Sequence, residues 1–106
     1  MKELNDLIGE FISGHGTTPY LKSLARCQIL RLIGEKYKIY KDLGAENIIT
    51  DALTHEKYTV RQAALRILLE QKDTLNPVNK NRLATFLRDK KNAAIITAVN
   101  KGFTAI

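Results

Sequence analysis

The chain has 106 residues, which makes one domain long enough to bury a core without metal or disulfide support. Its 44% hydrophobic and 26% charged residues are ordinary for a globular protein, and the lone Cys27 excludes a disulfide framework and a multi-cysteine metal site. The formal net charge of +6 favours an acidic partner but does not choose among nucleic acid, protein and membrane surface.

Two helices are predicted in the first part of the chain. Apolar residues recur at helical spacing from Leu4 to Ile12, and Ser13-Gly14 ends the pattern. Thr18 then supplies a capping hydroxyl in front of a proline, which predicts a second helix from Pro19 to about Tyr40. Its apolar arc is wide, so we expect neighbours on two sides of it.

Four more helices are predicted after a break at residues 41–44. They span Ala45 to Thr54, about Lys57 to Gln71, a segment that begins at Pro77, and a last segment that ends at Gly102. No segment shows a strand pattern, so we expect a single all-α domain over residues 1–106. Its helix pairs are predicted at about 2–40, 45–72 and 77–102.

The helices repeat along the chain. A shift of 35 positions lays Arg26 and Arg31 over Arg61 and Arg66, with apolar residues matching between them. A shift of 34 relates the central pair to the last one, and this register survives the turn between helices. Chance similarity of two amphipathic helices rarely does so.

The turn and the pattern Val60-Arg61-x-x-Ala64-x-x-x-Leu68 resemble the second helix of a HEAT-type repeat, best over residues 45–72. The resemblance implies six helices in three antiparallel pairs, stacked as a short right-handed HEAT-like α-solenoid with the second helices on its concave side. In the family, the arginine after the valine commonly bonds an acidic residue. This chain carries no Asp at the expected place in the turn, where Glu56-Lys57-Tyr58 stands instead.

Charge follows the same division. Residues 21–41 carry six Lys or Arg against one Glu, and residues 57–72 carry four against one, whereas residues 42–56 hold four acids and no Lys or Arg. Residues 1–20 also carry three acids against one Lys. The first helices of the first two pairs are therefore acidic and the second helices basic, which predicts a basic inner face. The residues predicted to contact a partner there are Arg31, Lys38, Gln62, Arg66, Asn100 and Lys101.

Two interpretations of this face compete. A cationic groove would attract phosphates or an acidic peptide, whereas a solvated helix face simply needs charge for solubility. Arg26 and Arg61 are kept apart from the groove because they lie nearer the apolar arc. We expect both to be structural, with guanidiniums that bond turn carbonyls or carboxylates.

Catalytic, cofactor and metal sites are not predicted. His15 and His55 are far apart and lack partners at ligand or catalytic spacing, and no carboxylate pair lies among the apolar faces. The loop from Gly14 to Pro19 lacks the Lys-Ser/Thr ending of a phosphate-binding loop. We therefore expect no enzyme.

The leading hypothesis is a non-enzymatic adaptor that recognises an acidic protein surface or peptide. The alternative is binding of DNA or RNA by the same basic groove. A weaker hypothesis is self-association through the C-terminal end, where Phe103, Ala105 and Ile106 leave an apolar tail. The opening residues are unlike a secretory signal and no apolar run approaches membrane-spanning length, so no membrane insertion and a cytoplasmic location are expected.

Overall fold

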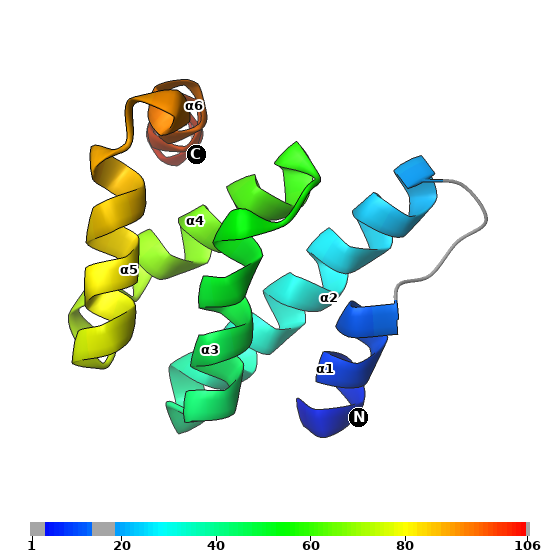
Figure 1. The fold of residues 1–106 in the computed structure, drawn as a ribbon. Coiled ribbons are helices and arrows are strands. Elements are labelled where there is room, and N and C mark those ends of the chain that lie inside the picture. Colours follow the sequence, from blue (N-terminus) through cyan, green and yellow to red (C-terminus); the bar gives the residue numbers. More distant parts are fainter. Residues whose placement is uncertain (1–3, 14–18, 106) are drawn as a thin grey trace.

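The computed structural model describes residues 4–13 and 19–105, with side chains described for 4–13 and 25–101. Within these residues all regular structure is helical, as the sequence predicts (Figure 1). The six α-helices are α1 (Leu4–Ser13), α2 (Pro19–Tyr40), α3 (Leu43–Asp51), α4 (Tyr58–Glu70), α5 (Pro77–Arg88) and α6 (Ala93–Ala105). Three short 3-10 helices join them: η1 (Ala52–Thr54), η2 (Lys72–Thr74) and η3 (Lys90–Asn92).

Local side chains explain where two of the helices begin. Asp42 accepts a hydrogen bond from the backbone N–H of Ala45 at 2.9 Å and so caps α3. Asn76 caps α5 in the same way, by accepting from the N–H of Asn79, and Pro77 occupies the first turn, where a missing N–H costs nothing.

The last helix runs further than expected. The sequence predicts its end at Gly102, but α6 continues to Ala105. Glycine weakens a helix by about 1 kcal/mol relative to alanine without stopping it, so it marks an end only where the chain also turns. The side chains of the apolar tail at Phe103, Ala105 and Ile106 lie outside the described ones, as does the expected interface there.

The helices form two rows. In Figure 1, α1, α3 and α5 stand side by side, and α2 and α4 run obliquely behind them. The contacts agree with this view, because α3 touches both α1 and α5, while α4 touches both α2 and α6. The radius of gyration is 13.3 Å, which matches a compact chain of this length.

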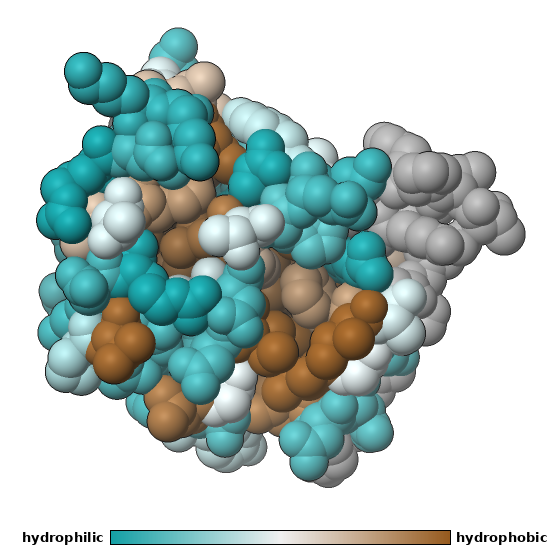
Figure 2. All heavy atoms as spheres, in the orientation of Figure 1, coloured by the Kyte–Doolittle hydropathy of each residue, from teal (hydrophilic) through white to brown (hydrophobic). Residues whose placement is uncertain are grey.

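One apolar cluster runs through the described helices. Its largest side chains exposed by less than 2% are Leu7, Leu30, Ile33, Tyr37, Ile49, Val60, Leu65, Leu68 and Val99. Four residues that the sequence places among the apolar positions of helices are instead largely exposed: Ile12 at 64%, Leu32 at 52%, Tyr40 at 68% and Val78 at 69%. Figure 2 shows apolar side chains at the surface between α1 and α3 and near the start of α5, within an otherwise hydrophilic face.

Candidate functional site

The predicted partner-binding residues lie on the even-numbered helices. Arg31 and Lys38 belong to α2, Gln62 and Arg66 to α4, and the remaining two to α6. Arg31, Lys38, Asn100 and Lys101 are exposed, and Gln62 and Arg66 are half-buried. The name α2–α4 face is used below for the surface formed by Arg31, Glu35, Lys38, Gln62, Arg66 and Glu70.

Helices α2 and α4 pack with a stagger. The Cys27 thiol interacts with the Thr59 hydroxyl, and the Lys38 amine lies 3.6 Å from a Glu70 carboxylate oxygen. The 35-residue repeat would put Gln62 opposite Cys27 and Asp73 opposite Lys38. Each observed partner comes three positions earlier, so side chains at equivalent repeat positions are offset along the two helices.

Lys38 is bonded on both sides. Its Nζ lies 3.4 Å from Glu35 on its own helix as well as 3.6 Å from Glu70 on α4. The bond to Glu35, together with the attraction of both carboxylates, raises the pKa of the Lys38 amine. Lys38 is therefore part of a mixed-charge cluster and not a lone cation in a basic stripe.

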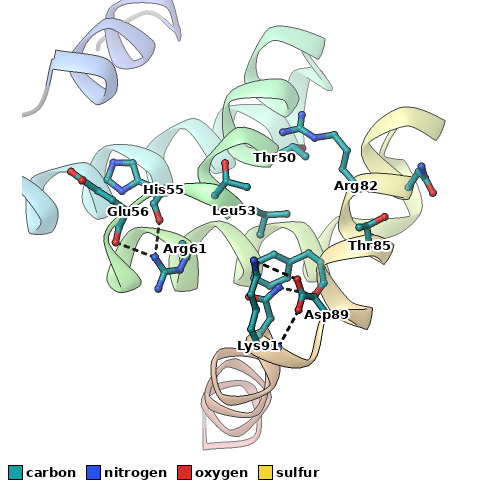
Figure 3. Close-up of a pocket in the computed structure, with 13 residues that line it drawn as sticks. Thr50, Leu53, His55, Glu56, Arg61, Arg82, Thr85, Asp89 and Lys91 are labelled. Carbon is teal, nitrogen blue, oxygen red and sulfur yellow. Dashed lines mark hydrogen bonds and ion pairs between the residues drawn. The ribbon is translucent and has the colours of Figure 1, made fainter.

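Arg26 and Arg61 bond the backbone at the end of the preceding helix or turn. The Arg26 guanidinium donates to the carbonyls of Phe11 and Ile12 at 3.0 and 3.1 Å. Arg61 Nη1 donates to the carbonyls of His55 and Glu56 at 2.8 and 3.1 Å (Figure 3). Helix ends leave carbonyls without intrahelical partners, and charged donors satisfy them well.

Between α5 and α6, an asparagine in place of an arginine bonds a helix-end carbonyl. The repeat places Ile95 where the central pair has Arg61, and Ile95 is buried. Asn92 instead donates its amide to the carbonyl of Phe86, at 3.0 Å, near the end of α5. The turn of each pair thus has a side chain that bonds carbonyls of the preceding segment.

Cys27 is not an activated thiol. Burial raises the pKa of its thiol above the usual value, against smaller lowering effects from the bond with Thr59 and the charge of Arg31. A raised pKa keeps the thiol protonated at neutral pH, and a protonated thiol is a poor nucleophile.

A cleft of about 660 Å³ opens among α3, η1, the turn before α4, α5 and η3 (Figure 3). Leu53 and Phe86 line it, together with threonine hydroxyls and charged groups. Its three cations have partners within the protein: Arg61 bonds carbonyls, Arg82 pairs with Asp51 at 2.7 Å and Lys91 lies 3.7 Å from Asp89. None of the six predicted partner-binding residues lines this cleft.

One buried carboxylate was not predicted from the sequence, where Glu46 counts only as one of the four acids in residues 42–56. Glu46 is 4% exposed. Its carboxylate accepts hydrogen bonds from the Tyr37 hydroxyl at 2.7 Å, from the backbone N–H of Asn76 at 3.1 Å, and from the side-chain amides of Asn76 and Asn79. These bonds join α2, α3 and the start of α5.

His55 lies in the turn before α4, close to α1. Its ring lies 6.3 Å from that of Phe11 on α1, and its Nδ1 accepts a hydrogen bond from the backbone N–H of Lys57 at 3.1 Å. Burial first, and then the charge of Arg26, lower the pKa of His55.

In residues 4–13 and 19–105, no cluster of three or more His, Cys, Asp or Glu is arranged to hold a metal ion. No helix among the same residues is both long and apolar enough to cross a membrane.

No family model, no curated protein and no solved structure matches the chain. The resemblance to HEAT-type repeats stays a prediction that rests on the residues of the sequence.

Proposed function

We propose that the chain is a non-enzymatic binding module, a short HEAT-like α-solenoid of three antiparallel helix pairs that recognises an acidic protein surface or peptide. Partner contacts come from the exposed faces of α2, α4 and α6. Arg31, Arg66 and Lys38 supply the positive charge, and Gln62, Asn100 and Lys101 extend the contact. Arg26 and Arg61 hold the turns in shape.

The order of helix contacts supports the solenoid. In a stack of helix pairs, each first helix touches the next first helix and each second helix the next second helix. Helix α3 contacts α1 and α5, and helix α4 contacts α2 and α6. These contacts support the proposed stack of three helix pairs.

The single observation that carries the functional proposal is the side-by-side packing of α2 and α4, each with an arginine that reaches the surface. Arg31 is exposed and Arg66 half-buried. Guanidiniums bind carboxylates with two parallel hydrogen bonds, so two arginines on neighbouring helices suit an acidic segment laid across them.

Capture from the native cell extract tests the proposal. Immobilised wild-type protein is compared with the Arg31→Glu, Arg66→Glu double variant, with and without nuclease treatment. We expect the double variant to lose at least about 90% of the captured protein partner, because reversing both charges converts attraction into repulsion. Capture should survive nuclease, which separates a protein partner from bound nucleic acid.

The matched control reverses two exposed cations elsewhere, Lys80→Glu with Lys90→Glu. It lowers the net charge by the same amount but leaves the α2–α4 face intact. Because Arg66 is half-buried, the exposed single variant Arg31→Glu is measured as well, in case the double variant folds poorly. Equal capture by the wild type and Arg31→Glu, or an equal loss in the control, would refute the proposed face.

A further inference from the structure

Charges of both signs alternate on the α2–α4 face. It holds three cations, Arg31, Lys38 and Arg66, and two carboxylates, at Glu35 and Glu70. The Glu35 side chain is 68% exposed and that of Glu70 43% exposed, so both carboxylates reach the solvent that a partner would displace. Lys38 lies between them, within 3.4 Å of one and 3.6 Å of the other.

A nucleic acid fits this arrangement poorly. Its backbone presents a negative charge at every nucleotide, and a groove that follows such a backbone needs uninterrupted positive charge. Two exposed carboxylates beside the arginines repel phosphates, and one of the three cations is already held between these carboxylates. Like charges placed against a wrong partner are a common source of specificity.

A protein segment that carries both signs of charge fits better. Carboxylates of such a segment would meet Arg31 and Arg66, while its cations would meet Glu35 and Glu70. Both sets of contacts are attractive, and the total charge of the segment matters less than the order of its charges.

We propose that the α2–α4 face binds a protein segment bearing both acidic and basic side chains, and that Glu35 and Glu70 exclude DNA and RNA from it. This inference rests on the proposed function, because it concerns the same face. It narrows the partner from any acidic ligand to a protein of mixed charge.

The first test uses a fluorescently labelled thymidine oligonucleotide of about 20 nucleotides, long enough to cover one small domain. Its affinity is measured by anisotropy at about 50 mM salt and again at about 200 mM, where phosphate contacts weaken. We expect weak binding by the wild type. The Glu35→Gln, Glu70→Gln variant should bind at least about tenfold more tightly and with a steeper salt dependence, because it removes the repulsion and releases Lys38.

The control variant is Asp51→Asn with Glu56→Gln. It raises the formal net charge by the same two units, and it also releases a paired cation, because Asp51 holds Arg82 at 2.7 Å. We expect its affinity for the oligonucleotide to rise less than about threefold. Equal gains in the two variants, or tight binding of the oligonucleotide by the wild type, would overturn the exclusion of nucleic acid.

The second test exchanges two charges without altering their sum. Arg31→Glu with Glu35→Arg keeps the net charge of the face but reverses the order of its signs on α2. The amount of protein captured should be at least about fivefold lower with this variant than with the wild type, because the charges of the segment that face α2 then meet their own sign. Unchanged capture would show that total charge alone is recognised and would refute the mixed-charge partner.

The two proposals fail in different ways. If Arg31→Glu leaves capture intact, the proposed function is wrong, whatever the oligonucleotide does. If capture depends on Arg31 but the charge exchange has no effect, the function stands and the mixed-charge partner falls.

Discussion

Helices α3 and α4 contact α1 and α2 at one junction and α5 and α6 at another, and these two junctions are built differently. At the junction of α1 and α2 with α3 and α4, apolar side chains and backbone approach closely, and Tyr37 of α2 also donates to Glu46 of α3. The junction of α3 and α4 with α5 and α6 is organised around a buried carboxylate and its hydrogen-bond donors.

Close packing characterises the first junction. Leu30 and Ile33 on α2 are fully buried. On the same helix Gly34 faces α4, and a Cβ placed on it would lie 3.0 Å from Ile67 Cδ1. The missing side chain therefore lets α2 and α4 approach each other.

Directional bonds characterise the second junction. Glu46 on α3 binds Asn76 and Asn79, and Asn79 also donates to Asn47 at 2.9 Å. Apolar contacts are non-directional and tolerate small shifts, whereas a buried carboxylate with several fixed donors accepts only one arrangement. We infer that packing sets how close α2 and α4 lie, and that hydrogen bonding sets how α5 is oriented on α3.

The largest expected effect comes from breaking the second junction. Glu46→Ala leaves buried donors from Tyr37, Asn76 and Asn79 without their acceptor, and we expect it to lower the free energy of unfolding by about 3 kcal/mol. Glu46→Gln keeps an acceptor and should cost about 1 kcal/mol. Urea denaturation measures both values.

Asp51→Asn is the matched control for this junction. It removes another carboxylate between α3 and α5, but the Asp51 and Arg82 side chains are 63% and 39% exposed. Exposed ion pairs contribute little, so we expect a loss of about 0.5 kcal/mol or less. If Glu46→Ala costs no more than Asp51→Asn, the buried network does not hold the third pair.

A somewhat smaller effect is expected from crowding the first junction. Gly34→Val places a branched side chain against Ile67, and overpacking should lower the free energy of unfolding by about 2 kcal/mol. Gly34→Ala is expected to change it by less than about 1 kcal/mol. The higher helix propensity of alanine offsets the contact, and the closest of the three contacting Ile67 atoms, Cδ1, is the tip of its side chain.

A second substitution isolates the contact. In the Gly34→Val background, Ile67→Ala makes room for the new side chain and should cost less than it does in the wild type. The resulting coupling energy is expected to be about 1 kcal/mol in a double-mutant cycle. Strict additivity would place the effect of Gly34→Val in the helix itself and not between α2 and α4.

Local signals in the sequence account for most of the fold. Apolar periodicity predicts six helices, and the capping residues followed by proline, Thr18-Pro19 and Asn76-Pro77, predict where two of them begin. The observed starts of α2 and α5 agree with this prediction. These signals act over a few residues and depend little on distant contacts. The predicted end of α6 was wrong because glycine alone does not terminate a helix.

The buried network was harder to predict. Glu46 lies three positions before Ile49 and seven before Leu53, so helical spacing does put it on the apolar side of α3. Its donors Asn76 and Asn79 come about thirty residues later, and only the packing of α5 against α3 brings them to it. Helical spacing therefore shows that the Glu46 carboxylate lies on an apolar face, but it does not show which donors bind it.

The candidate face shows the same limit. A helical wheel groups Arg31, Glu35 and Lys38 on one side of α2, and Glu35 and Lys38 do lie 3.4 Å apart. The pairing of Lys38 with Glu70 depends on the stagger between α2 and α4, which the 35-residue repeat does not reveal. The sequence therefore does not show that Glu70 offsets part of the positive charge of this face.

The smallest predicted effect is a pH dependence at the first junction, through His55. In the folded state, burial and Arg26, with smaller contributions from Arg61 and Lys57, lower the pKa of His55, and Glu56 opposes them. The unfolded chain has the ordinary value near 6.5 and so binds more protons just below that pH. The stabilising contribution of neutral His55 is complete above pH 6.5 and is lost as the pH falls through the lowered folded pKa.

Asparagine in place of His55 separates the proton from the hydrogen bond. In a His55→Asn variant, the side-chain amide oxygen can accept from the N–H two residues later, as His55 Nδ1 does from Lys57, but the amide does not titrate. Urea denaturation at pH 7.5 and at pH 5 should show a smaller loss of stability in His55→Asn than in the wild type, because the other titrating groups are common to both. An equal loss in the two proteins would mean that protonation of His55 does not weaken the contact between α1 and the turn before α4.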